Sequence, residues 1–243
     1  MASVSSRPGN SLSVPESSIV SSPQQISAQR SITSADVVSP RIPAANTAQI
    51  IKLQHHLEGH RGQRLILVIQ DFPDPDALSS AWAFQLIAAQ YEIQCEIVYA
   101  GTLSHQENIA LVKLTGLPAK RWGPQMLKDI DLSDYQGCVL VDSQGTNSQL
   151  MPLVQEADIP IVVIIDHHSQ QDEVEAEGAF VDIRPGSRST ATILTEYLQG
   201  GMLDFNSSNP THVKCATALM HGLRSDTINL LQAQEAEFMA AAY

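Results

Sequence analysis

The chain has 243 residues, of which 43% are hydrophobic, and carries a formal net charge of −12. This acidic balance argues against a protein that clamps a long duplex nucleic acid, which requires clustered Lys and Arg, although a small phosphorylated substrate is compatible because bound metal ions can supply positive charge locally. No apolar stretch reaches the roughly 18 residues of a membrane helix, and three cysteines without a pairing pattern favour a reducing compartment, so we expect a cytoplasmic protein with no membrane partner.

The first 45 residues are rich in Ser, Pro, Gln and Ala and contain few large apolar side chains. Such a segment cannot bury enough surface to offset the entropy of ordering, so we expect a disordered tail over residues 1–45 and one domain over residues 46–243. The shortage of acidic residues in the tail is also compatible with an organellar transit peptide, the less common explanation. A helix with a partial apolar face is expected over residues 48–58.

Four short apolar runs follow, over residues 65–69, 93–98, 138–141 and 161–165. Each is rich in β-branched residues, which is typical of strands buried on both faces of a parallel sheet. Helical segments separate them, and the alternation predicts an α/β fold with a doubly wound, mostly parallel sheet. The intervening helices are expected over residues 77–90 and 105–114. After residue 181 we expect a mainly helical part, with helices over residues 190–198, 211–223 and from about residue 230 to the end.

Ionisable residues follow three of the four predicted strands. They are Asp71, Asp74 and Asp76 after the first strand, Asp142 after the third, and Asp166, His167 and His168 at the end of the fourth. Because ligands of a doubly wound sheet bind outside the carboxyl ends of the strands, these side chains are predicted to meet at one edge of the sheet.

The residue types point to a metal site. Pro73 and Pro75 restrict the backbone, and in an extended segment Asp74 and Asp76 would project to the same side, where two carboxylates repel unless a cation lies between them. A proline turn with solvated carboxylates is an equally good interpretation of this segment, and Asp142 taken alone fits a helix cap slightly better. The helix that follows would offer N–H groups to a phosphate.

The Asp-His-His segment carries a stronger signal. Adjacent residues that leave a strand point in different directions, so His167 can ligate a metal while His168 faces a substrate. Imidazole together with carboxylate suits Mn, Fe, Co or Zn better than Mg or Ca. Two surface histidines are the alternative interpretation.

Four segments resemble, in order and approximate spacing, the four motifs of the DHH phosphoesterase superfamily. They are Pro73-Asp74-Pro75-Asp76-Ala77, Val141-Asp142-Ser143, Ile165-Asp166-His167-His168 and Gly222-Leu223-Arg224-Ser225-Asp226-Thr227. The Ser- and Thr-rich segment at residues 189–194 is similar to a helix start of the same family. The resemblance covers about residues 60–240 and is closest to the branch of bacterial oligoribonucleases and pAp phosphatases, and to cyclic-dinucleotide phosphodiesterases.

This resemblance implies a metal-dependent phosphoesterase that hydrolyses phosphodiester or phosphomonoester bonds of small nucleotides by two-metal activation of water. The implied ions are two Mn²⁺, with Mg²⁺ or Co²⁺ as alternatives, and Asp142 would bridge them. The implied metal ligands are Asp74, Asp76, Asp142, His167 and Asp226.

The resemblance also implies roles for neighbouring residues. His168 would contact the phosphate and Asp166 would orient His167 by accepting its other ring proton, so both are predicted catalytic residues. Arg188 and Arg224, together with Arg184, lie near the motifs and would contact phosphate oxygens, although a surface role fits each of them equally well.

The sequence departs from the family pattern at two points. Gln70 stands where the family usually has a histidine, which predicts a weakened metal site, with Asp71 as a substitute ligand. The sequence ends at Tyr243 within a predicted helix, so we expect the family's further substrate-binding domain to be absent or cut off. The face left uncovered would allow association with another chain, including a homodimer.

These departures favour an alternative function, a non-catalytic metal- or nucleotide-binding regulatory module on the same fold. A dinucleotide-binding oxidoreductase is excluded because no Gly-x-Gly-x-x-Gly turn follows the first strand.

Overall fold

The computed structural model describes residues 44–128, 130–171 and 176–243, so the tail predicted over residues 1–45 lies almost entirely outside the described residues. The described residues belong to one compact unit, Pro40–Tyr243. Their α-helices are α1 (Ala44–Gly59), α2 (Pro75–Ala89), α3 (Gln106–Thr115), α4 (Met151–Glu156), α5 (Thr190–Gln199), α6 (Pro210–Asp226) and α7 (Glu235–Ala242). A short 3-10 helix, η1, spans Met126–Lys128.

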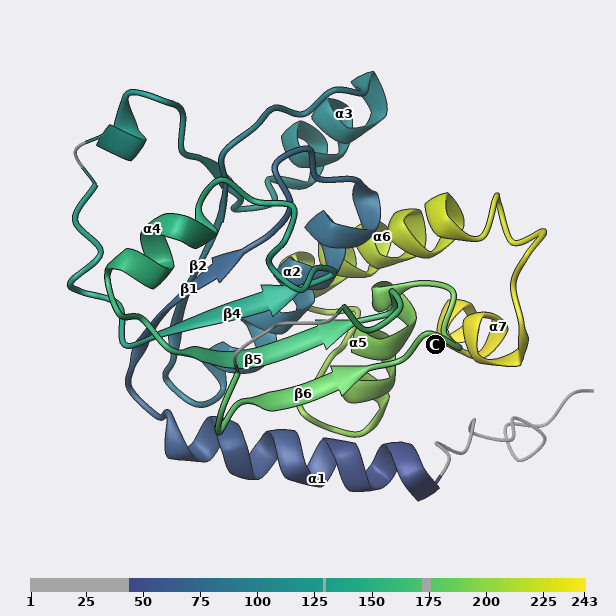
Figure 1. The fold of residues 1–243 in the computed structure, drawn as a ribbon. Helices are drawn as coiled ribbons and strands as arrows, with labels where there is room; N and C mark the ends of the chain where they lie inside the picture. Colours follow the sequence, from purple (N-terminus) through teal and green to yellow (C-terminus); the bar gives the residue numbers. More distant parts are fainter. Residues whose placement is uncertain (1–43, 129, 172–175) are drawn as a thin grey trace, which may run out of the picture. The chain divides into compact units, whose positions relative to one another are not determined.

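The strands form one sheet with parallel pairing throughout (Figure 1). They are β1 (Arg64–Val68), β2 (Gln94–Tyr99), β3 (Lys120–Arg121), β4 (Gly137–Val141), β5 (Ile161–Asp166) and β6 (Phe180–Ile183). Their order across the sheet is β3-β2-β1-β4-β5-β6. The chain therefore winds from β1 toward one edge and then returns to wind from β4 toward the other, which confirms the predicted doubly wound sheet.

Alternate residues of the central strands feed two hydrophobic cores, one on each face of the sheet. Leu65 and Leu67 of β1 belong to a larger core that includes side chains of α1, α2, α5 and α6. Ile66 and Val68 belong to a smaller core with residues of α4 and of the segment between β3 and β4. Burial on both faces explains why these strands are almost continuously apolar in sequence.

The edge strands and one short helix differ from the sequence prediction. Strand β6 was not predicted, because only alternate residues of it are buried, and the chain turns helical only after Ile183. Strand β3 is two exposed residues long, and the six-residue helix α4 was also missed. Short elements at an edge carry little hydrophobic pattern, so nothing in the sequence distinguishes them from loops.

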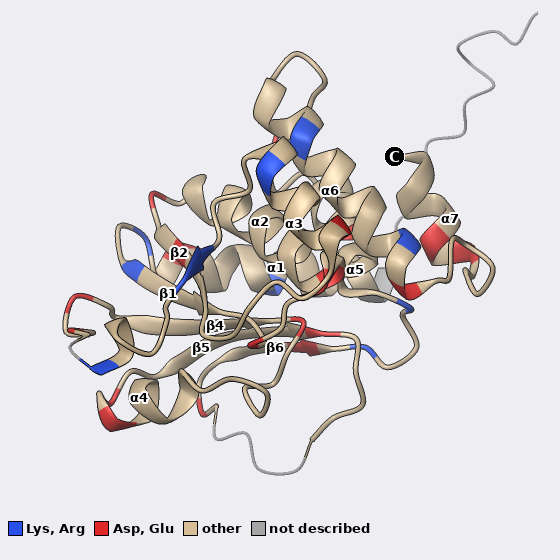
Figure 2. Cartoon of the chain, turned by 90° about the horizontal axis from the view of Figure 1, so that it is seen from above, with Lys and Arg blue, Asp and Glu red and all other residues tan. Residues whose placement is uncertain are grey.

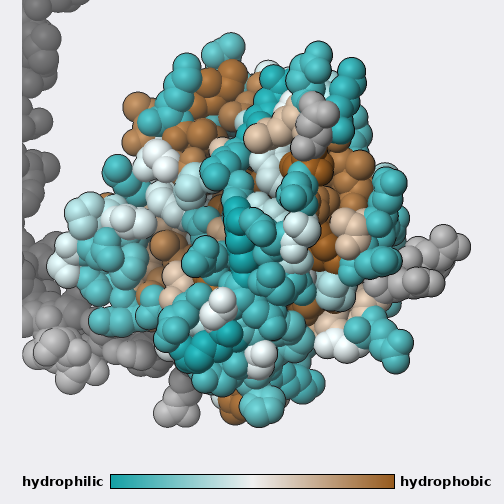
Figure 3. All heavy atoms as spheres, turned by 90° about the vertical axis from the view of Figure 1, so that its left-hand side faces the viewer, coloured by the Kyte–Doolittle hydropathy of each residue, from teal (hydrophilic) through white to brown (hydrophobic). Residues whose placement is uncertain are grey.

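One face of the surface and the cysteine of a central strand can be compared with the sequence. Hydrophilic residues cover the middle and lower parts of one face, with hydrophobic areas above and to the side (Figure 3). In the part of the chain that the structure describes, no helix is both long and apolar enough to cross a membrane. Cys138 is buried, as expected for an apolar strand, and burial raises the pKa of its thiol to about 12.

Candidate metal centre

The predicted site residues converge where the winding of the sheet reverses. Strands β1 and β4 are hydrogen-bonded neighbours, and their carboxyl ends lead to Asp76 and Asp142, while β5 beside them leads to His167. Figure 2 shows red acidic positions gathered where the central strands end, below α5 and α6. A crevice at such a reversal is where open α/β sheets bind ligands.

Asp76 is fully buried in the first turn of α2. Its carboxylate accepts hydrogen bonds from the backbone N–H groups of Thr190 and Ala191, both at 2.7 Å. These groups form the amino terminus of α5, where unpaired N–H groups and the helix dipole favour negative charge. Helix α5 therefore stabilises a buried carboxylate that is offered to the site by α2.

Asp74 precedes Asp76 and caps α2. Its side chain accepts a hydrogen bond of 2.9 Å from the N–H of Ala77, and Pro75 occupies the first helical position, where its missing N–H costs nothing. The sequence prediction of an extended segment through Asp76 is therefore wrong: the helix begins at Pro75, two residues earlier than expected. Asp74 nevertheless lies close enough for its charge to raise the pKa of Asp76.

Asp142 follows β4 in a left-handed backbone conformation, with φ of 58°. This region is uncommon for residues other than glycine, although Asp tolerates it better than most, and it is typical of functional turns. One carboxylate oxygen, Oδ1, accepts a 2.8 Å hydrogen bond from Thr190 Oγ1. The other oxygen, Oδ2, is buried and has no hydrogen-bond partner among the described residues.

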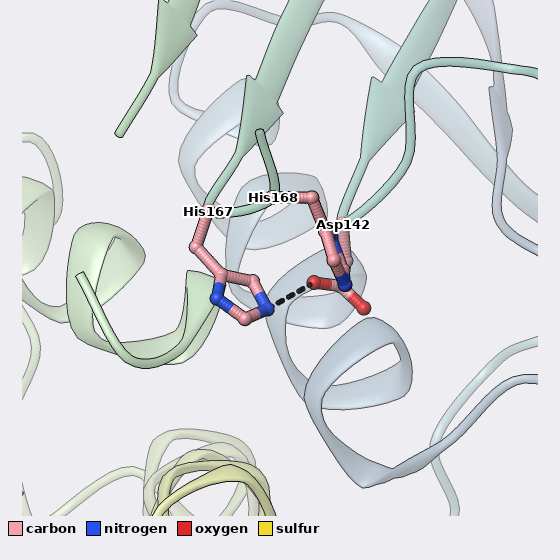
Figure 4. Close-up of side chains that lie close together, drawn as sticks. All are labelled: Asp142, His167 and His168. Carbon is pink, nitrogen blue, oxygen red and sulfur yellow. Dashed lines mark ion pairs between the residues drawn. The ribbon is translucent and has the colours of Figure 1, made fainter. Parts of the chain in front are cut away.

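His167 faces three carboxylates with one ring nitrogen. Its Nε2 lies 3.3 Å from Asp226, 3.5 Å from Asp142 and 3.8 Å from Asp76, and within the described part of the chain it makes no hydrogen bond. Figure 4 shows the ring pointing at the Asp142 carboxylate from the end of β5, with His168 beside it. His167 and the three carboxylates come from separate elements, so it is the fold that brings them together.

Asp226 reaches the site from the last turn of α6, and Gly222 permits this. A Cβ atom at position 222 would lie 2.5 Å from Ser79 Oγ and 3.0 Å from Asp76 Cα, so only glycine lets α6 pack this closely against α2. Residues 222 and 226 are four apart and lie on the same face of the helix. The close approach at Gly222 therefore delivers Asp226 to His167.

Asp166 orients a different histidine from the one expected. Its Oδ1 lies 2.8 Å from Nδ1 of His168 and accepts the His168 backbone N–H at 3.2 Å. Its Oδ2 accepts a hydrogen bond of 2.7 Å from Gln144 Nε2. The expectation that Asp166 would accept the ring proton of His167 is wrong, because the chain turns after β5 so that the second histidine folds back onto this carboxylate.

Burial and mutual repulsion strongly raise the pKa values of two buried acidic side chains. Burial, followed by the charges of Asp226 and Asp74, raises the pKa of Asp76 to about 7. Burial and the charge of Asp76 likewise raise the pKa of Asp142 well above its usual value. Burial lowers the pKa of His167, but the carboxylates around it outweigh this effect and the net shift is upward. Such crowding is the charge conflict that a bound cation relieves.

The donor atoms fit divalent metal. Among the described residues, two groups have ligand atoms that all lie within 4.8 Å of one another: Asp142 with His167 and His168, and Asp76 with His167 and Asp226. The unsatisfied Asp142 Oδ2 and His167 Nε2 are the two buried atoms of the site for which a metal would supply the missing partner. His167 belongs to both groups, so its side chain is the point at which the two candidate ligand sets meet.

Two further residues of the expected site have structural partners. Gln70 Nε2 donates to Asp74 Oδ2 at 3.3 Å, so it lies beside the centre. Asp71, considered as a substitute ligand, is instead bound by the loop after β4: Gln149 donates to its Oδ2 through Nε2 at 2.8 Å, and Ser148 Oγ donates to its Oδ1 at 3.4 Å. Asp71 therefore joins the loops that follow β1 and β4.

The three arginines have different surroundings. Arg184 is paired with Asp182 and Glu196. Arg224 donates to Asn229 Oδ1 at 2.7 Å. Arg188 is exposed two residues before α5 begins, and its backbone N–H donates to Glu237 Oε1 at 3.0 Å. Contact of Arg188 or Arg224 with a substrate phosphate stays a prediction.

Sequence reasoning overlooked two residues that support the site. Thr190 contacts Asp142 through its hydroxyl and Asp76 through its N–H, and Gln144 holds Asp166. Thr190 lies in the Ser- and Thr-rich segment that signalled a helix start, but its direction toward the strands could not be deduced from that pattern. Gln144 carries no signal in the sequence.

The chain is similar to several known proteins in sequence and in fold. A relative from Methanocaldococcus jannaschii, the uncharacterized protein MJ1633, is 34% identical over 195 residues, which are 79% of this chain and 36% of the relative. The chain thus spans about a third of that protein. The crystal structure of an exopolyphosphatase-related protein from Bacteroides fragilis aligns with a TM-score of 0.61 at 14% identity, covering 80% of this chain and 55% of the other.

A second solved structure, of RecJ in complex with Mn²⁺ from Thermus thermophilus, aligns with a TM-score of 0.32 at 12% identity, over 85% of this chain and 32% of that one. The sequence model described as the DHH family, N-terminal domain, matches residues 65–223, which run from β1 into α6. The chain belongs to the DHH family.

Proposed function

We propose that this protein is a metal-dependent phosphoesterase that hydrolyses phosphodiester or phosphomonoester bonds of small nucleotides. The observation that carries the proposal is the position of His167, whose Nε2 faces carboxylates from α2, from the end of β4 and from α6 at 3.3–3.8 Å without a hydrogen bond of its own among the described residues. His167 Nε2 and Asp142 Oδ2 are both buried without a hydrogen-bond partner among the described residues, which is costly unless a cation completes the site.

Asp76, Asp142, His167 and Asp226 would hold divalent ions, with Mn²⁺ as the proposed species, and Asp74 would join them from its capping position. Bound there, the ions would acidify a water molecule and stabilise charge on the phosphoryl oxygens. Hydrogen bonds hold two of the proposed ligands in place: α5 holds Asp76 through backbone N–H groups, and Thr190 holds Asp142. Such preorganisation limits the reorganisation needed during reaction.

His168 would contact the phosphate. Its hydrogen bond with Asp166 raises its pKa, so the ring carries a proton over a wider pH range than a free histidine would. Nδ1 is held by Asp166, and the ring is half exposed at the edge of the centre. A protonated Nε2 could therefore donate a hydrogen bond to a phosphate oxygen of the substrate.

Charge supports a small substrate. The Lys and Arg positions are scattered over several elements in Figure 2, and the net charge of −12 would repel a long polyanion. Oligoribonucleotides, pAp and cyclic dinucleotides are the proposed substrates. The Bacteroides fragilis protein is described as exopolyphosphatase-related, which makes short-chain inorganic polyphosphate, with few charges per molecule, the second candidate.

The test uses protein stripped of metal and then supplied with Mn²⁺, Mg²⁺ or Co²⁺, and follows product release from each candidate substrate. Asp142→Asn should lower turnover about 100-fold or more, because Asn tolerates the left-handed backbone but removes the charge. Asp158→Asn is the matched control, since Asp158 also has a left-handed backbone, with φ of 52°. It precedes the amino end of β5, whereas the metal centre lies at the carboxyl ends of the strands. This control should keep wild-type activity.

Three outcomes separate the hypotheses. Metal-dependent turnover that Asp142→Asn abolishes supports the phosphoesterase. Binding of Mn²⁺ and nucleotide without turnover of any substrate would instead support a regulatory module on the same fold. Turnover that survives Asp142→Asn unchanged would refute the proposed metal centre.

A further inference from the structure

A cavity of about 470 Å³ lies between the loop after β1 and the loop after β4. Its lining comprises Gln70, Asp71 and Phe72 from the first loop and residues 146–149 from the second. Its size is within the range of roughly 300–1,000 Å³ found for small-molecule sites. Because both loops leave the carboxyl ends of neighbouring strands, the cavity opens at the same edge of the sheet as the metal centre.

The cavity adjoins the metal centre through a single side chain. Gln70 lines the cavity and donates a hydrogen bond to Asp74 Oδ2 at 3.3 Å. Asp74 caps the helix whose first turn carries Asp76. A ligand whose phosphate sits at the metal centre would therefore reach the cavity with the group attached to that phosphate.

Phe72 is an exposed aromatic residue on a fixed loop. Its relative exposure is 63%, which for one apolar residue alone is common. The backbone on each side of it is held, however: the N–H of Asp71 donates to Asn147 O at 3.0 Å, and Pro73 O accepts from Asn108 Nδ2 at 3.2 Å. The ring is thus presented to solvent at the cavity by a loop that is already ordered.

The lining suits an uncharged, planar, polar group. It contains no Lys or Arg, so it offers nothing to a second phosphate. The amides of Gln70, Asn147 and Gln149 supply both donors and acceptors, and within the described residues no hydrogen bond engages the side chain of Asn147. An aromatic face beside such amides is the combination that recognises unpaired nucleobases by stacking and by their hydrogen-bonding edges.

We propose that this cavity is a nucleobase subsite, in which Phe72 stacks on the base of the substrate and the neighbouring amides contact its edge. The inference rests on the proposed function, since it assigns the group attached to the scissile phosphate. It adds a specificity-determining residue, Phe72, that no proposed catalytic step requires.

The test compares binding of AMP and of ribose 5-phosphate to the full chain by calorimetry in the presence of Mn²⁺. The two ligands share the sugar phosphate and differ in the base. Wild-type protein should bind AMP at least about tenfold more tightly, the lower range of one stacked base. Phe72→Ala should remove most of this preference and leave the affinity for ribose 5-phosphate unchanged, while Phe72→Trp should keep it. Phe238→Ala, at another exposed phenylalanine, is the matched control and should keep it as well.

A preference for AMP that persists in Phe72→Ala would overturn the subsite, as would equal affinity of the wild-type protein for the two ligands. These binding results do not depend on turnover. A protein that hydrolyses phosphoesters but fails this comparison refutes the base subsite alone. A preference that Phe72→Ala removes supports the subsite, and the turnover assay then decides separately between an enzyme and a regulatory module.

Discussion

Gly222 of α6 lies directly against Asp76 of α2, so that a single added methyl group would come within 3.0 Å of the Asp76 Cα atom. The contact couples the packing of two helices to the position of two proposed ligands, because Asp226 follows Gly222 by one helical turn.

Replacement of this glycine should therefore damage both stability and metal binding. We expect Gly222→Ala to lower the free energy of unfolding by about 1–3 kcal/mol, the usual cost of overpacking, and to weaken Mn²⁺ binding by moving Asp226 away from His167. Urea denaturation and calorimetric titration measure the two effects. Gly59→Ala is the control, since a Cβ atom there meets nothing within 4 Å; equal behaviour of the two variants would contradict the role of Gly222.

The metal-free protein should lose stability as pH rises. The pKa of Asp76 is raised in the folded state to about 7 from 3.8, so the folded chain binds this proton more tightly than the unfolded chain does. The stabilisation from protonated Asp76 is complete below pH 3.8 and disappears as pH approaches 7. Denaturation in EDTA at about pH 5 and about pH 8, on either side of the raised pKa, should show the loss, and Asp76→Asn should flatten it.

Asp76→Asn also changes the free energy of unfolding by an amount that does not depend on pH. This amount cancels when the pH dependences of the two proteins are compared, so the slope of stability against pH is the quantity to measure. Added Mn²⁺ should reverse the trend, because metal binds the deprotonated carboxylate. Identical pH slopes for the wild-type protein and Asp76→Asn would show that Asp76 is not the titrating group.

A histidine at position 70 should strengthen the metal centre. Gln70 already lies within hydrogen-bonding distance of Asp74, and imidazole is a better ligand for transition metals than a neutral amide. We expect Gln70→His to bind Mn²⁺ more tightly by about tenfold, the lower end of typical changes in metal-ligand environments. Unchanged titrations would place residue 70 outside the coordination sphere.

The Asp166 to His168 hydrogen bond can be tested by titration. Asp166 raises the pKa of His168, so Asp166→Asn should bring that pKa back toward 6.5, the ordinary value for the group. Nuclear magnetic resonance of the His168 ring in metal-free protein reports the midpoint directly. Asp158→Asn should leave it in place; a His168 midpoint that does not respond to Asp166→Asn would mean that the hydrogen bond is not formed in solution.

The sequence predicted the sheet, and it predicted that most of the candidate site residues lie together at one end of its strands, because both depend on strong local signals. Strand β4 is apolar at nearly every position, and such strands must be central in a parallel sheet, so the edge that carries Asp142 and His167 followed directly. The direction of individual side chains did not follow. Whether Asp166 turns to His167 or His168 depends on the turn after β5 and on Gln144, which lies 22 residues earlier in the chain.

Long-range packing was the other part that the sequence could not provide. In the sequence Gly222 is one position of a motif, whereas its importance comes from the backbone of α2 on the opposite side of the contact. The prolines predict an extended segment through Asp74 and Asp76, but proline also favours the first position of a helix. In the structure Pro75 begins α2, so Asp76 is helical.

The amino terminus of α5 touches Asp76 through two N–H groups and Asp142 through the Thr190 hydroxyl. One helix thus holds, by hydrogen bonds, two carboxylates that follow strands from the two halves of the sheet. A small shift of α5 along its axis would move both carboxylates and change the distance between them. The position of this helix, which contributes no proposed ligand, would therefore determine the size of ion that the protein prefers.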